Sequence, residues 1–291
     1  MGVFQRQSTV RRVSPVSRNT IAVILVAAVI MGMLTYSSWR LMNPGQKHAG
    51  RTTQLVTRYT EGVPNVHEPS GLAPPRPDAL AGFTQVYVND FAAKGVPRGW
   101  TTFHGVPGGD PGGQFGPSHV SVTNGVLRLL AARDVHYNNR WVTGGLCQCG
   151  FPHMYGAYFV RSRETGPGAN EVQLLWPAND QWPPEIDFNE SPYLHQTTAT
   201  VHWGFANATQ QWTKTGVNMT SWNTWGVIWT SRYILFVLNG RVWGTLTDPV
   251  AIPRLPMRLD LEQRTFCTVH LQCPKAPRQM QVDWIAEYRP N

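Results

Sequence analysis

Three carboxylates lie within six residues of one another in the segment Glu-Ile-Asp-Phe-Asn-Glu at positions 185–190. If the segment is a β-strand, Glu185 and Asp187 point to the same face, because side chains alternate with a period of two. Glu190 joins them only if one extra residue is inserted after Asp187, as in a β-bulge, a feature common beside active sites. We therefore predict a bulged strand that gathers the three acids on one face.

Acids this close cannot all ionise freely, because their mutual repulsion raises the pKa of at least one of them. One carboxyl group then stays protonated while another is anionic, and a retaining glycosidase needs this division of labour. In such enzymes the nucleophile and the acid lie about 5–5.5 Å apart. We predict Glu185 as the nucleophile, Glu190 as the acid/base, and Asp187 as the group that orients the nucleophile.

The alternative for these acids is an edge strand that exposes them to solvent. Ile186 and Phe188 argue against it, because apolar residues that alternate with the acids indicate a strand with one buried face. Trp176 and Trp182 precede the acids, and aromatic faces suit sugar rings. Both tryptophans are therefore predicted to contact a sugar.

The elements that must position these residues are predicted to be short strands. Apolar or alternating runs recur between Gly, Pro, Asn and Asp clusters, and Asn239-Gly240 between two runs is a strong hairpin signal. Twelve Trp, 27 Gly and 23 Pro with only 14% charged residues also favour a turn-rich, all-β protein. This pattern predicts a β-sandwich or jelly roll. The predicted strands are 83–91, 120–123, 126–132, 155–163, 171–176, 185–190, 197–203, 225–230, 233–238, 241–246, 256–262 and 280–288.

The sequence resembles glycoside hydrolase family 16, the laminarinase and lichenase family, whose signature is Glu-aliphatic-Asp-x-x-Glu on a bulged strand. Residues 154–164, 222–243 and 280–288 also resemble strands of that family, and the resemblance covers residues 81–291 in the family's order. It implies a concanavalin A-like jelly roll of two curved antiparallel sheets, with the substrate cleft along the concave sheet. Pro184 departs from the glycine that the family often has there, which affects the expected loop shape.

The resemblance also implies roles for residues outside the acid segment. His202 and Trp203 lie on an expected strand beside the acids, where His202 would tune a carboxyl group; the alternative is a structural histidine. One of Glu262 and Gln263 is expected to contact a sugar hydroxyl, and we retain Gln263 as the candidate. Asp283 matches a position that contributes to a structural calcium site in many relatives. No cofactor is expected to be required.

The implied function is a retaining, endo-acting β-glycan hydrolase whose substrate is a polysaccharide, most commonly a β-1,3- or mixed β-1,3/1,4-glucan. One alternative is a transglycosylase of a cell-envelope glycan, which would form the same covalent intermediate. The other is a catalytically silent carbohydrate-binding protein, against which the presence of all three acids argues. A monomer is expected.

The N-terminal residues predict a membrane anchor. Residues 1–19 form a basic tail, residues 20–39 an apolar run long enough to span a bilayer, and residues 40–80 a Pro-rich linker. Four arginines precede the run and Arg40 closely follows it, which keeps the N-terminus in the cytoplasm. We predict a single-pass signal anchor in the cell membrane, with a catalytic domain at 81–291 outside; a cleaved signal and a secreted protein are the alternative.

The net charge of +8 comes mainly from residues 1–51, which hold seven basic side chains and no acid. The remainder is nearly neutral, so no basic stripe for phosphates is expected and no nucleic-acid partner is predicted. In an exported chain the four cysteines favour disulfides. Because Cys147 and Cys149 are closely spaced, we expect a Cys267–Cys273 bond or cross-links between the two pairs. A zinc site is the alternative, although these spacings do not match usual zinc motifs.

Overall fold

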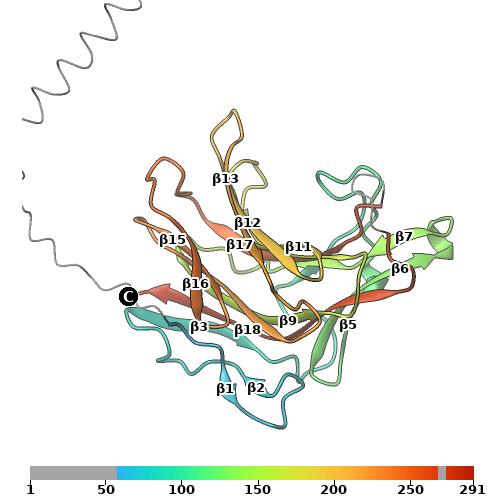
Figure 1. Cartoon of the computed structure of the whole chain (residues 1–291), viewed down its shortest axis with the longest axis horizontal. Helices are drawn as coiled ribbons and strands as arrows, with labels where there is room; N and C mark the ends of the chain where they lie inside the picture. Colours follow the sequence, from blue (N-terminus) through green and yellow to red (C-terminus); the bar gives the residue numbers. More distant parts are fainter. Residues whose placement is uncertain (1–57, 268–272) are drawn as a thin grey trace, which may run out of the picture. The chain divides into compact units, whose positions relative to one another are not determined.

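The computed structural model describes residues 58–267 and 273–291, which form two stacked antiparallel sheets (Figure 1). One sheet has seven strands in the order β13-β12-β11-β10-β17-β8-β4. These strands are β4 (Thr101–Thr102), β8 (Gly145–Cys147), β10 (Asn170–Pro177), β11 (Glu185–Tyr193), β12 (Gln196–Trp203), β13 (Ala208–Thr215) and β17 (Met257–Arg264). The predicted all-β jelly-roll sandwich is confirmed.

The second sheet has nine strands, with β16-β15-β14-β9-β18-β6-β5 in order, β3 paired with β18 and β7 paired with β6. They are β3 (Phe83–Asn89), β5 (Val120–Thr123), β6 (Val126–Asp134), β7 (Arg140–Thr143), β9 (Gly156–Glu164), β14 (Asn223–Trp229), β15 (Ile234–Leu238), β16 (Arg241–Leu246) and β18 (Arg278–Pro290). Two 3₁₀ turns, Pro117–His119 and Val135–Tyr137, are the helical elements of the described residues. No helix in this part of the chain is long and apolar enough to cross a membrane. The predicted basic tail and membrane span, at 1–19 and 20–39, lie outside the described residues.

The core between the sheets explains why the acids face outward. Ile186 and Phe188 on β11 are fully buried, and they pack in one cluster with Leu259 and Leu261 of β17. Alternation therefore turns the intervening polar residues of both strands to the opposite face of the seven-stranded sheet. Burial of the apolar residues of these strands thus determines that the polar residues face the cleft side of the sheet.

The hairpin between β15 and β16 forms where the sequence predicts it. Asn239 and Gly240 have φ values of 47° and 73°, the left-handed conformation that a two-residue turn of this kind requires. Asn239 also accepts a hydrogen bond from the Thr224 amide through its side chain, at 2.8 Å. The turn is therefore held against the neighbouring strand β14.

Residues 58–80, predicted as part of a free linker, instead pack on the nine-stranded sheet. The strands β1 (Val63–Pro64) and β2 (Leu72–Ala73) form a small sheet, drawn beneath β3 and β18 in Figure 1. The Trp284 indole donates a hydrogen bond of 2.8 Å to the Leu72 carbonyl, and Leu80 is buried beside Trp284. The ordered structure therefore begins before the predicted boundary at residue 81, with residues 58–80 as a layer on the sheet. Residues 40–57 lie outside the described residues.

The disulfides only partly match the expectation. Cys267 and Cys273 are bonded, as predicted, but Cys147 is bonded to Cys149, the pairing that their close spacing had argued against. The chain leaves β8 after Cys147 and enters a turn, which brings the two Cα atoms to 5.1 Å. This separation lies within the normal range for a disulfide, so no cross-link between the pairs is needed.

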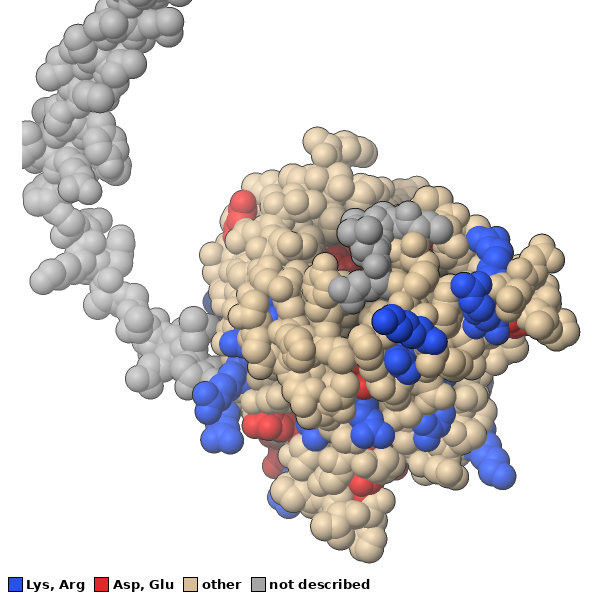
Figure 2. Space-filling view, turned by 45° about the vertical axis from the view of Figure 1, so that its right-hand side comes forward, with Lys and Arg blue, Asp and Glu red and all other residues tan. Residues whose placement is uncertain are grey.

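Surface charge on the described residues is mixed. On the face drawn in Figure 2, Lys and Arg side chains are interspersed with uncharged residues and acids. Such a distribution offers no continuous track for a phosphate backbone on that face.

We predict that a truncated protein of residues 81–291 is less stable than one of residues 58–291, by at least about 3 kcal/mol. Removal of residues 58–80 would expose the apolar side chains that Leu80 covers. It would also leave the Trp284 N–H without the Leu72 carbonyl as its hydrogen-bond partner. Guanidinium unfolding of both proteins measures the difference. Equal midpoints and slopes would show that residues 58–80 are only a linker after all.

Candidate active site

The bulge that the acid spacing predicts is present in β11. Asp187 pairs with Thr200 of β12, and Glu190 pairs with Thr198, so three steps along β11 match two steps along β12. The register against β10 shifts at the same place, between Gln173 and Leu174. One extra residue therefore separates Asp187 from Glu190, and it restores Glu190 to the face of the other two acids.

All three acids line one open cleft of about 1260 Å³ on the outer face of the seven-stranded sheet. Its floor comes from β10, β11, β12 and β17, and its rim from loops around residues 103–109 and 265–266. Trp176, Trp182 and His202 line the same cleft. The structure thus brings six of the eight predicted site residues together.

Glu185 is held by two hydrogen-bond donors. The Trp182 indole N–H donates to Glu185 Oε2 at 2.7 Å. Asp187, which is 3% exposed, is hydrogen-bonded to Glu185 through its side chain. Because hydrogen bonds to a carboxylate favour its charged form, both contacts oppose the effect of burial, which raises the pKa of Glu185.

Asp187 has the opposite balance. Burial, then the charges of Glu185 and Glu190, raise its pKa well above the usual range. His202 Nε2 lies 3.5 Å from Asp187 Oδ2, and Asn207 Oδ1 contacts the other ring nitrogen at 2.8 Å. The protonated Asp187 therefore donates its proton toward Glu185, which remains the anion of the pair.

Glu190 is a carboxyl group with a pKa near neutrality. Burial and the charge of Glu185 raise its pKa to about 7, while the guanidinium of Arg264 lowers it and Glu262 raises it. A group of this kind exchanges a proton readily at neutral pH, which suits a general acid and base. The bulged strand therefore places two carboxyl groups with different surroundings, Glu185 and Glu190, on one face of the cleft.

A second row of charged residues, unexpected as a set, lines the cleft from β17. Arg258, Asp260, Glu262 and Arg264 alternate with the buried Leu259 and Leu261, and all four face the cleft. They form ion pairs with one another: Arg258 Nε lies 3.3 Å from Asp260 Oδ1, and Arg264 Nη2 lies 2.5 Å from Glu262 Oε2. The alternation with leucine was the sequence signal that could have revealed this row.

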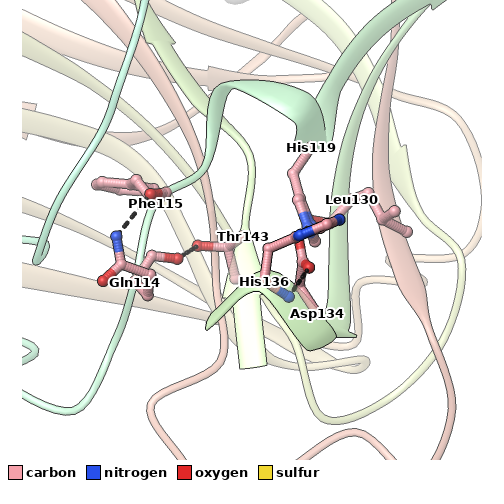
Figure 3. A network of polar contacts seen from close by, with 7 residues as sticks. All are labelled: Gln114, Phe115, His119, Leu130, Asp134, His136 and Thr143. Atoms are coloured by element: carbon pink, nitrogen blue, oxygen red, sulfur yellow. Dashed lines mark hydrogen bonds and ion pairs between the residues drawn. The ribbon is translucent and has the colours of Figure 1, made fainter. Parts of the chain in front are cut away.

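One rim of the cleft is anchored by the polar network of Figure 3. The Thr143 amide donates to the Gln114 carbonyl at 2.8 Å, and the Gln114 side chain donates to the Phe115 carbonyl at 2.8 Å. Nearby, His119 contacts both the Leu130 carbonyl, at 3.2 Å, and Asp134, at 3.1 Å. This network ties the loop before β5 to β6 and β7, and Phe115 of that loop lines the cleft.

Two predicted site residues lie elsewhere. Trp203 follows His202 on β12 and packs against the core between the sheets. Gln263 follows Glu262 on β17, is fully buried, and donates to Glu164 Oε2 at 2.9 Å. The reason is the same for both: neighbouring residues of a strand point to opposite faces, so Glu262 reaches the cleft and Gln263 does not.

Asp283, the expected calcium ligand, is fully buried on β18. Its Oδ2 accepts a hydrogen bond from the Ser70 amide at 3.0 Å, and its Oδ1 has no hydrogen-bond partner. Calcium needs several oxygen ligands. Among the described residues, the group of three acid or histidine ligand atoms within 4.8 Å is Glu185, Asp187 and His202, without Asp283. A calcium role for Asp283 therefore stays a prediction that depends on backbone oxygens or water.

A sequence model described as glycosyl hydrolases family 16 matches residues 112–285, more than half of the chain. No curated protein matches the sequence.

Solved structures share the fold at low sequence identity. The catalytic domain of an endo-1,3-beta-glucanase (laminarinase) from Thermotoga petrophila RKU-1 has a TM-score of 0.63 and 17% identity, over 72% of this chain and 98% of that chain. A GH16 protein of the Bacteroides ovatus mixed-linkage glucan locus, in complex with a G4G4G3G product, has a TM-score of 0.60 and 17% identity, over 69% and 99%. A structure from work on endo-acting O-glycanases of the human gut microbiota that initiate mucin breakdown has a TM-score of 0.64 and 18% identity, over 75% of this chain and 94% of that chain.

The buried acids make stability depend on pH. Because folding raises the pKa of Glu190 to about 7, the folded state holds its proton to a higher pH than the unfolded state. The contribution of Glu190 to the free energy of unfolding is therefore greatest below about pH 4.5 and is lost as pH rises toward 7. We predict that Glu190→Gln reduces the fall in unfolding free energy between pH 5 and pH 8 by about 2 kcal/mol.

Urea unfolding at several pH values measures this effect, with the exposed carboxylate variant Asp78→Asn as the control. The control is expected to follow the wild-type curve. A Glu190→Gln curve parallel to wild type would contradict the burial and repulsion assigned to Glu190.

Proposed function

The chain belongs to glycosyl hydrolase family 16 and is a glycosidase, and we propose that it is a retaining, endo-acting β-glycan hydrolase. The observation that carries this proposal is the one-residue bulge that sets Glu185, Asp187 and Glu190 on one cleft face. An open cleft, rather than a closed pocket, suits cleavage within a long polymer.

In the first step, a Glu185 carboxylate oxygen attacks the anomeric carbon of the sugar. Glu190 gives its proton to the glycosidic oxygen as the bond between that oxygen and the anomeric carbon breaks. The Trp182 N–H and the Asp187 proton keep Glu185 anionic and oriented before the attack. As negative charge leaves Glu185 in the covalent intermediate, the shared proton of Asp187 can relax back toward its own carboxylate.

In the second step, Glu190 is the anion and takes a proton from water. The water oxygen then bonds to the anomeric carbon and Glu185 leaves, so that the product keeps the original anomeric configuration. A pKa of about 7 supports both roles of Glu190, since neither protonation state is costly at neutral pH.

A neutral β-glucan, with β-1,3 or mixed β-1,3/1,4 linkages, is the proposed substrate. Val172, Leu174 and Trp176 form an apolar stripe on β10 between two rows of acids, and Trp182 is 43% exposed beside it. Sugars present apolar ring faces and hydroxyl edges that match such a floor. The arginines of the cleft are already paired with acids, which disfavours a strongly anionic glycan. The names of the similar structures add support for glucans.

We also propose that the protein acts on polysaccharide outside the cell, held at the membrane by residues 20–39. The support is the apolar run with its preceding arginines and the two disulfides, which form in oxidising compartments. Calcium is proposed only as a structural ion at Asp283, distant from the chemistry, and no step above uses it.

The test of the function is product analysis with the full chain on soluble β-1,3-glucan, mixed-linkage glucan and galactan. We expect the mean length of a glucan to fall sharply within the first turnovers and a series of short oligosaccharides to follow, because an endo-acting enzyme cuts inside the chain. Products longer than supplied oligosaccharides would instead establish a transglycosylase. Binding without any cleavage would establish a silent carbohydrate-binding protein.

We predict that Glu190→Ala loses most activity on polymer but is rescued by azide on aryl glycosides with good leaving groups. Such substrates need no proton from Glu190 in the first step, and azide replaces water without needing a base. Azide displaces Glu185 from the anomeric carbon, so a β-glycosyl azide should accumulate. Chromatography of the product checks this, with Glu61→Gln as a matched glutamate control outside the cleft. An absence of glycosyl azide, or an α-glycosyl azide, would contradict the assignment of Glu190.

A further inference from the structure

Glu262 of β17 lies level with Glu190 of β11, across the intervening strand β10. Val172 of β10 pairs with Glu190 on one side and with Glu262 on the other, and all three face the cleft. Two strand spacings therefore separate the backbones of the two glutamates, roughly 9–10 Å. The residue between them, Val172, has a short side chain and is buried.

Arg264 occupies the next cleft-facing position of β17 after Glu262. Its Nε donates to Glu262 Oε2 at 2.5 Å, and its Nη2 lies 2.5 Å from the same oxygen. The ion pair is largely buried, with side-chain exposures of 11% for Arg264 and 8% for Glu262. Charges removed from water in this way act on their neighbours with little screening.

The guanidinium is held in place on three sides. Arg264 Nη1 donates to the Gly108 carbonyl at 2.5 Å, and the rings of Phe115 and Phe266 lie 5.6 Å and 5.7 Å from its central carbon. Gly108 and Phe115 belong to the rim loop that the network of Figure 3 anchors. Arg264 is therefore fixed between the rim and the acid row and does not swing freely toward a ligand.

We propose that Glu262 and Arg264 are positioning residues that act on Glu190 from across β10. The carboxylate of Glu262 favours the protonated form of Glu190, and the guanidinium of Arg264 favours the anionic form. The two effects oppose each other, so each residue offsets the other at Glu190, and loss of either one alone would make one of the two proton transfers of the catalytic cycle harder. This inference rests on the proposed function for the catalytic cycle, but the electrostatic effect itself does not.

Several other charged or titratable groups face Glu190 and must be separated from this effect. Glu185 and Asp187 lie on its own strand, and His202 lies on β12. Tyr193 lines the cleft at the end of β11, and β10 brings no titratable side chain to it. On β17, Asp260 and Arg258 lie one and two cleft-facing positions beyond Glu262. His104 is on the rim, and Asp110 acts on Arg264. The opposite signs of Glu262 and Arg264 distinguish their effect from that of these groups.

The test is a direct titration of Glu190 by carbon NMR of the full-length protein, with ¹³C at the glutamate carboxyl carbons. The Glu190 signal is the one that Glu190→Gln removes. We expect its midpoint to move down by about one pH unit in Glu262→Gln, which removes a like charge. In Arg264→Gln the midpoint should move up by a similar amount, because an opposite charge is lost.

The double variant Glu262→Gln/Arg264→Gln removes both charges, and its midpoint should return to within about 0.5 unit of wild type. It also keeps the proposal testable if Arg264→Gln alone leaves Glu262 unpaired and fails to fold. Asp260→Asn, a carboxylate lost from the neighbouring row of the same strand, should move the midpoint much less than Glu262→Gln. Melting curves check that each variant is folded.

Shifts of Glu262→Gln and Arg264→Gln in the same direction, or no shift in either folded variant, would overturn the proposal. The alkaline limb of kcat/KM on a cleaved glucan should follow the NMR midpoints. If the NMR shifts appear but no glycan is cleaved, the proposed function fails while the electrostatic role stands. If cleavage is normal and the midpoints do not move, the electrostatic role fails while the function stands.

Discussion

The single extra residue in β11 between Asp187 and Glu190 is the constraint on which the site depends. Without it, strand alternation would place Glu190 with Phe188's face, in the apolar core, where an unpaired carboxylate is costly. With it, β11 serves two purposes. Ile186 and Phe188 secure the strand between the sheets, and the acids reach the cleft from a strand that is paired on both sides of the bulge. Because neighbouring strands hold β11 on both sides, the acids do not need a flexible loop to bring them together.

Burial then divides the acids into different protonation states. Asp187 is nearly inaccessible and retains its proton, whereas Glu185 receives two hydrogen bonds that stabilise its charge. Glu190, on the far side of the bulge, lacks the indole donor that Glu185 has and faces the charge pair of β17 instead. Repulsion alone would make the site a poor place for a carboxylate. The hydrogen-bond donors to Glu185 and the guanidinium of Arg264 on β17 partly offset this repulsion, and the remaining cost in stability rises with pH.

Much of the fold could be predicted because most strands have one apolar face. All twelve predicted runs are strands, and Asn239-Gly240 is the turn expected between two of them. The strand β13 could not be predicted: it is an edge strand, almost entirely exposed, so its polar residues show no alternation. The acid row could be predicted because its spacing makes sense only with a bulge. The β17 row was missed as a set, although Leu259 and Leu261 marked its parity, and that parity also explains why Glu262 rather than Gln263 lines the cleft. The packing of residues 58–80 depends on distant partners such as Trp284, which local sequence does not reveal.

The central claim is that Glu185 forms a covalent bond to the sugar. The most direct measurement is mass spectrometry of the peptide that carries the label, after reaction with a 2-deoxy-2-fluoro β-glycoside that bears a good leaving group. The fluorine slows both steps, and the good leaving group lets the intermediate accumulate. We expect one fluoroglycosyl group on Glu185 and none on Asp187 or Glu190. A label on either of those acids, or an unlabelled protein that cleaves glucan with inverted configuration, would contradict the account.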